Sequence, residues 1–358
     1  MDRIARLLSL STRASRILEV GPSYNPVAPK SAGWNTHVVD HASREEIQAK
    51  YATADVDTTL IEDVDTIWQG GCLHDSVPIA LHGSFDTLIA SHFIEHTPDL
   101  VGFLISASHL LRPNGVIALA IPDRRFCFDY FRSPSLTGDL LEAHAAGRTR
   151  HSRRTAWNHM AYSATMDGAL GWKPGPTGVP RLMDPFASAA ATNAAFRDDA
   201  EAPYADYHAW QFSPSGFALA VLELGALGMI DWQIDRLHTP EAFEFFAFLR
   251  RGATIFTSNE AMQAARLSLL NAQLMETREQ IEFALAGGGL VSATGRQALS
   301  SGPARDATDQ RLTEIAALLR EQNGQLREIG ITAAWVRTLL RPARALWRLP
   351  GRIARRQR

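Results

Sequence analysis

The chain has 358 residues, of which 46% are apolar, and its formal net charge at neutral pH is −2. This composition allows one large or two ordinary domains with real cores, and it excludes a chain that is disordered throughout. The two cysteines, Cys72 and Cys127, provide no disulfide framework, so we expect a reducing, cytoplasmic compartment and two small buried thiols. No stretch approaches the roughly 20 apolar residues that a membrane span needs.

The strands of a single sheet can be predicted in chain order. Residues 1–16 are basic and carry only a short apolar run, which favours an amphipathic helix beside the first strand over a signal peptide. From residue 16 to about 254, apolar runs alternate with helical patterns, as in a doubly wound, mostly parallel α/β sheet. The predicted strands are 17–20, 37–40, 64–68, 85–90 and 116–121, and a closing pair at 229–234 and 243–249 completes a sheet of about seven strands.

Capping and turn residues mark two of the connections between these strands. Ser43 and Glu46 form a capping box, which predicts a helix after the second strand. Pro113 and Gly115 cannot both continue a helix, so the stretch HLLRPNGVIALAI predicts a helix end, a Pro-Asn-Gly turn and the buried fifth strand.

The connection after the fifth strand is unusually long. Residues 132–209 are rich in Ala, Pro, His and Arg, and we expect an irregular insertion that is either a substrate lid over the carboxyl edge of the sheet or a family-specific embellishment. A helix follows before the closing strands, and it begins at Ser213 or Ser215.

The pattern changes after a first domain that we place at residues 1–255. Thr257 and Glu260 form a second capping box at the start of a predicted helix over 256–285. A Gly/Ser/Ala linker over 286–308 separates it from a helical, Arg-rich extension over 309–358. Isolated helices of this kind are marginal in water, so both need a partner surface, such as a helix-mediated oligomer. The first helix carries an apolar stripe with roughly heptad spacing at Leu267, Leu270, Leu274, Ile281 and Leu285.

The end of the chain is strongly basic. Eight arginines and no acidic residue follow Glu328, and apolar residues recur along one helical side from Trp335 to Ile353. This pattern is typical of a segment that contacts an anionic membrane surface, which would place the protein peripherally at the inner face of a membrane. A solvated tail and an RNA-binding tail are the alternatives, but no nucleic-acid module accompanies the arginines, so we expect no nucleic-acid partner.

The first strand runs directly into a tight turn in the stretch RILEVGPSYNPVAPK. The carboxyl edge of an open parallel sheet binds small molecules, and Gly21 allows the backbone to approach a ligand closely. Glu19 at the strand end can accept a hydrogen bond, and Asp40 at the end of the next strand is placed for a ribose diol. The order of strand, glycine turn, helix, strand and acid predicts a nucleoside site.

Four blocks resemble the class I S-adenosylmethionine-dependent methyltransferases, particularly those that act on small molecules: ILEVGPS, HVVDH, FDTLIASHFIEHTPD and LLRPNGVIALAIPD. The later stretch HAWQFSPSGFALAVLELGALGMI is similar to the helix before the closing hairpin of that family. The family's first motif carries three glycines, and here Ser23 and Asn25 replace the second and third. The resemblance implies S-adenosylmethionine as the cofactor.

The resemblance also implies roles for particular residues at the matching positions. The turn after the first strand would hold the methionine end of the cofactor, Asp40 its ribose hydroxyls and Leu73 an apolar face of its adenine, while the start of the third block would line the floor beneath the sulfonium. The implied cofactor-binding residues are Glu19, Gly21, Ser23, Asp40, Leu73, Ser91 and His92.

The stretch HFIEH also matches a His-x-x-Glu-His zinc motif, in which His92 and His96 would share one face of a helix. A strand precedes it and the turn Thr97-Pro98-Asp99 follows, so we expect a loop and a helical turn there and no metal.

Three side chains are candidate general bases: His96 after the fourth strand, Asp123 at the end of the fifth, and His208 at the end of the insertion. Asp123 can instead cap a helix, and each histidine can be a hydrogen-bonded structural group. His151, His159 and Tyr162 are possible polar contacts to a sugar-like acceptor.

The resemblance implies methyl transfer to a small-molecule or glycan acceptor, most simply to a hydroxyl. The acceptor class and a role in polysaccharide biosynthesis rest on the resemblance alone. The altered glycine motif favours an alternative, a catalytically degenerate binding or scaffold protein in a glycan-assembly complex. A metal-dependent hydrolase is a third interpretation, which only the HFIEH stretch supports.

Overall fold

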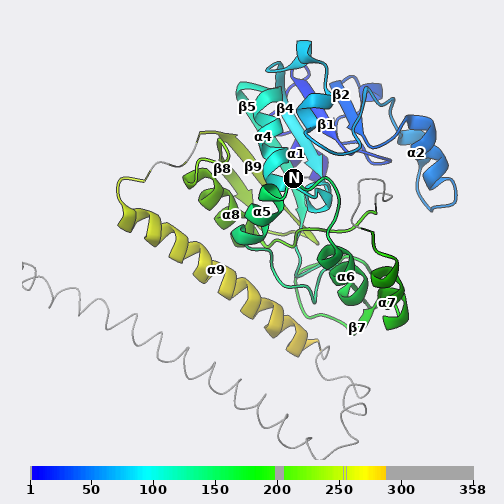
Figure 1. Ribbon diagram of the computed structural model, residues 1–358, viewed down its shortest axis with the longest axis vertical. Helices are drawn as coiled ribbons and strands as arrows, with labels where there is room; N and C mark the ends of the chain where they lie inside the picture. Colours follow the sequence, from blue (N-terminus) through cyan, green and yellow to red (C-terminus); the bar gives the residue numbers. More distant parts are fainter. Residues whose placement is uncertain (1, 198–204, 253, 255, 288–358) are drawn as a thin grey trace, which may run out of the picture. The chain divides into compact units, whose positions relative to one another are not determined.

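The computed structural model describes residues 2–197, 205–252, 254 and 256–287. In this part of the chain a seven-stranded sheet has the order β3-β2-β1-β4-β5-β9-β8 (Figure 1). Strands β1 to β5 are mutually parallel, β9 is antiparallel to β5, and β8 is antiparallel to β9. The predicted doubly wound, mostly parallel sheet is confirmed. The strand bounds are β1 Arg16–Val20, β2 Asn35–Asp40, β3 Thr66–Ile67, β4 Phe85–Ser91, β5 Leu111–Pro122, β8 Trp232–His238 and β9 Glu244–Arg251.

The central strands are buried on both faces, which explains their nearly continuous apolar runs. Along β1, Leu18 belongs to the core on one face of the sheet and Ile17 to the core on the other, as the alternation of strand side chains requires. Helices α4 (Leu100–Leu110) and α8 (Pro214–Ala226) contribute to the first core, and α1 (Arg3–Leu7) contributes Leu7 to the second.

The connection from β1 to β2 differs from the predicted order because it contains no α-helix. Its only regular element is the 3-10 turn η1 (Lys30–Ala32). The carboxylate of Glu19 accepts hydrogen bonds from the amides of Val27 (2.5 Å) and Ala28 (3.0 Å), and both of these residues are buried in the second core. Glu19 therefore anchors a proline-containing loop that covers the sheet in place of a helix.

Most other connections follow the predicted signals. The capping box of Ser43 and Glu46 begins α2 (Arg44–Tyr51), and Ser213 is the N-cap of α8. The predicted turn at residues 113–115 lies inside β5 instead of before it, as an irregularity where the register with β4 shifts between Phe85 and Thr87. The short elements are η2 Thr58–Leu60, α3 Leu73–Ser76, η3 Ile79–Leu81 and η4 Ile94–His96. Cys127 is buried as expected, whereas Cys72 is exposed.

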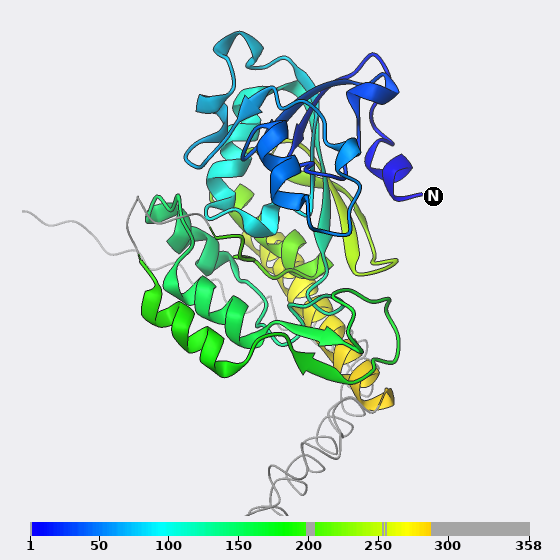
Figure 2. The ribbon, with the colours of Figure 1, turned by 90° about the vertical axis from the view of Figure 1, so that its right-hand side faces the viewer.

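The insertion between β5 and α8 is more regular than predicted. It contains α5 (Thr137–Ala145), α6 (Arg153–Tyr162), β6 (Ala164–Met166), β7 (Pro180–Leu182) and α7 (Phe186–Ala195). Strands β6 and β7 form a separate antiparallel pair. Figure 2 shows α6 and α7 in green below the sheet, with the small strand pair beside the yellow helix α9.

Helix α9 (Asn259–Ala286) matches the predicted helix, but its N-cap is Ser258 instead of Thr257. It packs on α8 (Figure 1). Polar side chains make this contact: the carboxylate of Glu276 accepts hydrogen bonds from the backbone amide and the hydroxyl of Ser215, and Arg266 pairs with Glu223. The predicted apolar stripe faces away from these contacts and is exposed. A helix-mediated oligomer through this stripe stays a prediction.

The remaining predictions for the C-terminal part lie outside the described residues. These are most of the linker, the second helix and the basic segment with its membrane contact. Among the described helices, none combines the length and apolar character that crossing a membrane requires.

Replacing Glu19 with Ala is expected to lower the free energy of unfolding by about 2–4 kcal/mol, because two buried amides lose their acceptor. Glu19→Gln keeps one acceptor oxygen and should lose less. Urea unfolding of the wild type and both variants measures the difference. Equal midpoints for Glu19→Ala and the wild type would show that the loop needs no anchor.

Candidate active site

A cavity of about 1320 Å³ opens at the carboxyl edge of the sheet. It lies at the ends of β1, β2, β4 and β5, and the insertion contributes residues from 149 to 208 to its wall. Strands β1 and β4 are neighbours although β2 and β3 lie between them in sequence, so the cavity occupies the switch point where open α/β sheets bind ligands. Single-ligand pockets measure roughly 300–1,000 Å³, so this cavity has room for two ligands.

The turn after β1 forms one wall of the cavity. Gly21 has φ +66°, and a Cβ atom there would lie 2.4 Å from Cδ2 of Phe93. Ser23 also adopts a left-handed conformation, with φ 50°, although it replaces a motif glycine. Its Oγ atom is buried and has no hydrogen-bond partner among the described residues. The loop thus keeps a glycine-like backbone path, and Ser23 lines the cavity.

Asp40 ends β2 beside this turn and lines the same wall. One carboxylate oxygen accepts a hydrogen bond from the amide of Ser23 (2.9 Å), and the other lies 2.6 Å from Nδ1 of His41. The amide of His41 also donates to this second oxygen (2.7 Å). A carboxylate has about four acceptor positions, so these three contacts leave about one for a ligand hydroxyl. Asp40 both shapes the turn and faces the cavity, as its predicted role requires.

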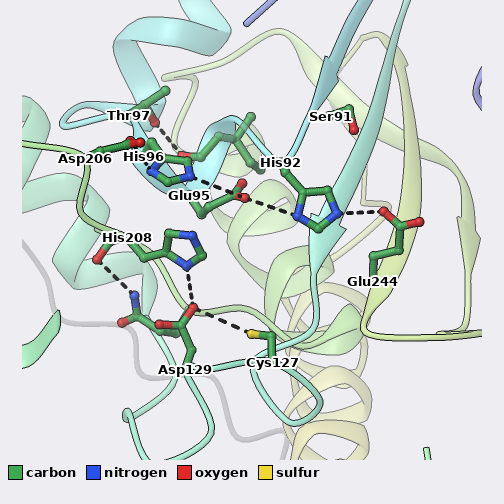
Figure 3. Close-up of polar contacts among 12 residues, drawn as sticks. Ser91, His92, Glu95, His96, Thr97, Cys127, Asp129, Asp206, His208 and Glu244 are labelled. Atoms are coloured by element: carbon green, nitrogen blue, oxygen red, sulfur yellow. Dashed lines mark hydrogen bonds and ion pairs between the residues drawn. The ribbon is translucent and has the colours of Figure 1, made fainter. Parts of the chain in front are cut away.

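Ser91 and His92 lie at the end of β4 and also line the cavity. His92 adopts a left-handed conformation, with φ 50°, and its Nε2 lies 2.7 Å from the carboxylate of Glu244 on β9 (Figure 3). Arg3 of α1 donates to Glu244 (2.8 Å) and to the hydroxyl of Ser91. Arg3 and Glu244, which come from opposite ends of the domain, therefore hold Ser91 and His92 in place. Ser91 and His92 are the residues predicted to form the floor beneath the sulfonium.

The residues just past β3 supply an apolar and amide wall instead of the acid that the family usually has there. Trp68 and Gln69 line the cavity, and the ring of Trp68 lies 5.8 Å from that of Phe93. Leu73, the predicted adenine contact, is fully buried in the core and does not line the cavity. Trp68 is the better placed apolar surface, and its position directly after the strand is the signal that could have identified it.

Three side chains of the cavity wall form a cluster that we call the acceptor group: Glu95, His96 and His208. Glu95 and His96 belong to the single 3-10 turn η4, as predicted for the HFIEH stretch, and His208 comes from the end of the insertion. One ligand atom from each residue lies within 4.8 Å of the others, and the two imidazole rings stand at 89° to each other (Figure 3).

Two aspartates hold the histidines of the acceptor group. Nδ1 of His96 lies 2.8 Å from Asp206, and Nδ1 of His208 lies 2.6 Å from Asp129, which also pairs with Arg132 (2.6 Å). Burial alone would raise the pKa of Asp129, but His208 and Arg132 hold it well below its usual range. Burial opposes protonation of His96, yet its hydrogen bond to Asp206 raises the pKa of the ring.

Glu95 is the most buried member of the acceptor group, with 1% of its surface exposed. Its carboxylate lies 3.7 Å from Nδ1 of His92 and 3.9 Å from Nε2 of His96, and neither oxygen has a hydrogen-bond partner among the described residues. In the sequence, Glu95 stands out only as part of the HFIEH motif. The burial of its carboxylate without a hydrogen-bond donor among the described residues depends on the tertiary structure.

Two further predicted site residues do not line the cavity. Glu19 anchors the loop after β1, and burial raises its pKa to about 7 although two amides donate to it. Asp123 is fully buried in a two-pronged pair with Arg125, at 2.9 and 2.7 Å. Burial raises the pKa of Asp123, and Arg125 opposes the rise. With its carboxylate bound to Arg125, Asp123 has no access to an acceptor, so we leave it out of the proposed site.

The three insertion residues that were possible contacts to a sugar-like acceptor lie in different places. His159 lines the cavity next to His208, and burial lowers its pKa to about 3. His151 lies instead in a smaller neighbouring pocket, and Tyr162 is exposed.

Comparison with known proteins decides the family. Residues 1–170, which contain β1 to β5 and part of the insertion, match the family model described as a methyltransferase domain. Residues 1–170 therefore contain a methyltransferase domain, and the sheet has the strand order of the class I fold. This match, together with the strand order, confirms the resemblance that the four sequence blocks predicted.

Solved structures that match this methyltransferase are distant. The CcbJ methyltransferase from Streptomyces caelestis is 11% identical, with 70% of this chain and 94% of that chain covered at a TM-score of 0.36. The 1,6-didemethyltoxoflavin-N1-methyltransferase of Burkholderia thailandensis is 10% identical, with 70% and 76% covered at 0.34. A Rhodobacter sphaeroides protein named as a candidate Zn-dependent alcohol dehydrogenase is 13% identical, with 71% and 91% covered at 0.39. No curated protein matches the sequence.

The pairing of Asp123 predicts a structural effect. Asp123→Ala is expected to lower the free energy of unfolding by about 3–5 kcal/mol, because it removes the two-pronged partner of a buried arginine. Among the described residues, Arg125 would keep contacts with the Glu279 carboxylate and the Glu276 carbonyl. Asp63→Ala removes an exposed ion pair with Arg44 and should cost less than about 1 kcal/mol. Thermal unfolding of both variants tests this, and a fully stable Asp123→Ala protein would restore Asp123 as a candidate base.

Proposed function

We propose that this methyltransferase uses S-adenosylmethionine to methylate a hydroxyl of a small-molecule acceptor. The observation that carries the proposal is one cavity with two chemically different ends. One end has the left-handed turn at Gly21 and Ser23 beside Asp40, and the other has the acceptor group of Glu95, His96 and His208. A cavity of this volume can hold a cofactor and an acceptor together.

The residues at the first end fit the cofactor. Gly21 lets the backbone approach a ligand, the buried Oγ of Ser23 lacks a partner, and Asp40 can accept from ribose hydroxyls. Ser91 and His92 form the adjoining floor, and Trp68 offers an apolar face next to it. When bound, S-adenosylmethionine supplies an activated methyl group. The protein then has to position a nucleophile and assist the loss of its proton.

The acceptor group is suited to the second task. Nδ1 of each histidine lies against a carboxylate, so proton exchange with a bound hydroxyl would take place at Nε2. We therefore retain His96 and His208 from the predicted bases and add Glu95. A sugar or other glycan hydroxyl as the acceptor, with a role in polysaccharide biosynthesis, is supported by the family resemblance alone.

The two missing motif glycines favour the alternative of a catalytically degenerate scaffold protein. Ser23 keeps the left-handed backbone that a glycine would adopt there, which weakens that support.

Calorimetric titration with S-adenosylhomocysteine tests the proposal. The wild type is expected to bind, and Asp40→Ala should bind about 10–100-fold more weakly, because charge-assisted hydrogen bonds contribute about 1.5–3 kcal/mol each. Asp40→Asn keeps an acceptor for the amide of Ser23 and separates loss of the ligand contact from loosening of the turn. Asp55→Ala, on an exposed loop, should bind like the wild type.

Two results would count against the proposal. No binding by the wild type at high micromolar concentration would favour the scaffold alternative. Binding by Asp40→Ala with unchanged affinity would refute the ribose role of Asp40.

A further inference from the structure

We propose that Glu95, His96 and His208 bind a divalent transition-metal ion at the acceptor end of the cavity. The three residues offer one carboxylate oxygen and two imidazole nitrogens, and these atoms lie within 4.8 Å of one another. All three side chains line the cavity, so an ion among them would also be reachable by a ligand. The site itself does not depend on the proposed function, whereas its role toward the acceptor does.

The carboxylate of Glu95 is the first independent observation that points to a cation. It is almost completely buried and accepts no hydrogen bond among the described residues. Burying an ionised carboxylate without a partner costs several kcal/mol, and proteins normally compensate with a cation or a hydrogen-bond donor. The nearest cationic or titratable groups are the rings of His92 and His96, at 3.7 and 3.9 Å. A bound cation would satisfy the Glu95 carboxylate.

The aspartates behind the histidines are the second observation. Metal-binding histidines almost always donate their other ring N–H to a carboxylate or carbonyl, which fixes the tautomer and orients the ring. Asp206 at 2.8 Å from Nδ1 of His96 and Asp129 at 2.6 Å from Nδ1 of His208 provide this support (Figure 3). Arg132 holds Asp129 in turn, so the ring of His208 has a fixed orientation.

This set of ligands differs from the one in the HFIEH motif. That motif would pair His92 with His96 on a helix, but η4 is a single 3-10 turn and Nε2 of His92 is bound to Glu244. The third ligand is His208, which lies at the far end of the insertion. No metal was expected from the sequence because the strand before HFIEH and the turn after it place the motif in a loop and a helical turn.

Two imidazoles and one carboxylate suit zinc and divalent iron, cobalt or nickel better than magnesium or calcium. Three protein ligands leave at least one coordination position open, and an acceptor hydroxyl can occupy it. The ion lowers the pKa of a bound hydroxyl: the O–H bond breaks, the proton passes to water, and the electron pair stays on the oxygen. The ion, and not a single imidazole, then prepares the nucleophile of the proposed methyl transfer.

Cobalt(II) is the probe, because its visible absorption reports coordination without any activity measurement. The full-length protein is first freed of metal with a chelator and then titrated with cobalt(II). We expect about one ion per chain, visible bands in the absorption spectrum, and displacement by zinc. Glu95→Gln, which preserves shape, and His208→Ala should each weaken cobalt binding at least tenfold.

A second histidine group provides the matched control. His74, His82 and His109 lie on the other side of α3 and α4, with the rings of His74 and His109 stacked at 4.3 Å. His109 is exposed, so His109→Ala should leave the cobalt affinity unchanged. Circular dichroism confirms that each variant is folded, and cobalt should raise the melting temperature of the wild type more than that of Glu95→Gln.

The inference is overturned if the wild type binds no stoichiometric cobalt, or if Glu95→Gln and His208→Ala bind it as tightly as the wild type. Loss of binding in His109→Ala alone would assign the ion to the surface histidines and also overturn it. Titration of the same samples with S-adenosylhomocysteine separates the two proposals. Cofactor binding without cobalt binding refutes only the metal site, and cobalt binding without cofactor binding refutes only the proposed function.

Discussion

The two hydrogen bonds that Glu19 accepts from Val27 and Ala28 determine how the first strand leads into the site. A parallel sheet needs cover on both faces, and here an anchored loop provides part of that cover where a helix was expected. Because the loop is held at Val27 and Ala28, the turn at Gly21 and Ser23 has a fixed path past the end of β2. The proline-rich sequence after the glycine is thus compatible with an open cavity, since the anchoring carboxylate lies outside it.

The last residues of the insertion, and not only its helices, complete the wall of the cavity. The carbonyl of Glu95 accepts hydrogen bonds from the amides of Ala209 and Trp210, and the indole of Trp210 donates to the carbonyl of Thr97. These bonds tie the end of the insertion to the turn η4. His208 therefore stands opposite Glu95 and His96 as a direct result of backbone pairing, which makes the acceptor end a composite of two distant segments.

The electrostatics of the two ends differ accordingly. At the turn after β1, the polar atoms are a hydroxyl, backbone amides and the carboxylate of Asp40, a set suited to neutral hydroxyl and amine groups. At the acceptor end, the buried carboxylates of Glu95 and Asp129 and the exposed carboxylate of Asp206 lie around two imidazoles. Among these three carboxylates in the described part of the chain, Asp129 is the one that pairs with an arginine. The buried carboxylate of Glu95, which accepts no hydrogen bond among the described residues, is the feature on which the proposed cation site rests.

Much of the fold followed from local sequence patterns. Apolar runs, the Ser43 capping box and the glycine after β1 predicted the strands, α2 and the edge of the sheet that binds ligands, because each signal acts over a few residues. Several of the site residues that the sequence predicted also line the cavity. They are Gly21 in the turn, Asp40 at the end of β2, Ser91 and His92 at the floor, and the histidines His96 and His208.

Only the tertiary structure decided which partner each polar group received. Asp123 pairs with Arg125 and lies outside the site, and Leu73 lies in the core. Glu244 contacts His92, and Arg3, from the other end of the domain, donates to Glu244 and Ser91. Glu95 became a buried carboxylate next to His208, more than a hundred residues away in the chain. Such pairings depend on which strands lie side by side and on where a long insertion returns, and no periodicity within a segment encodes either.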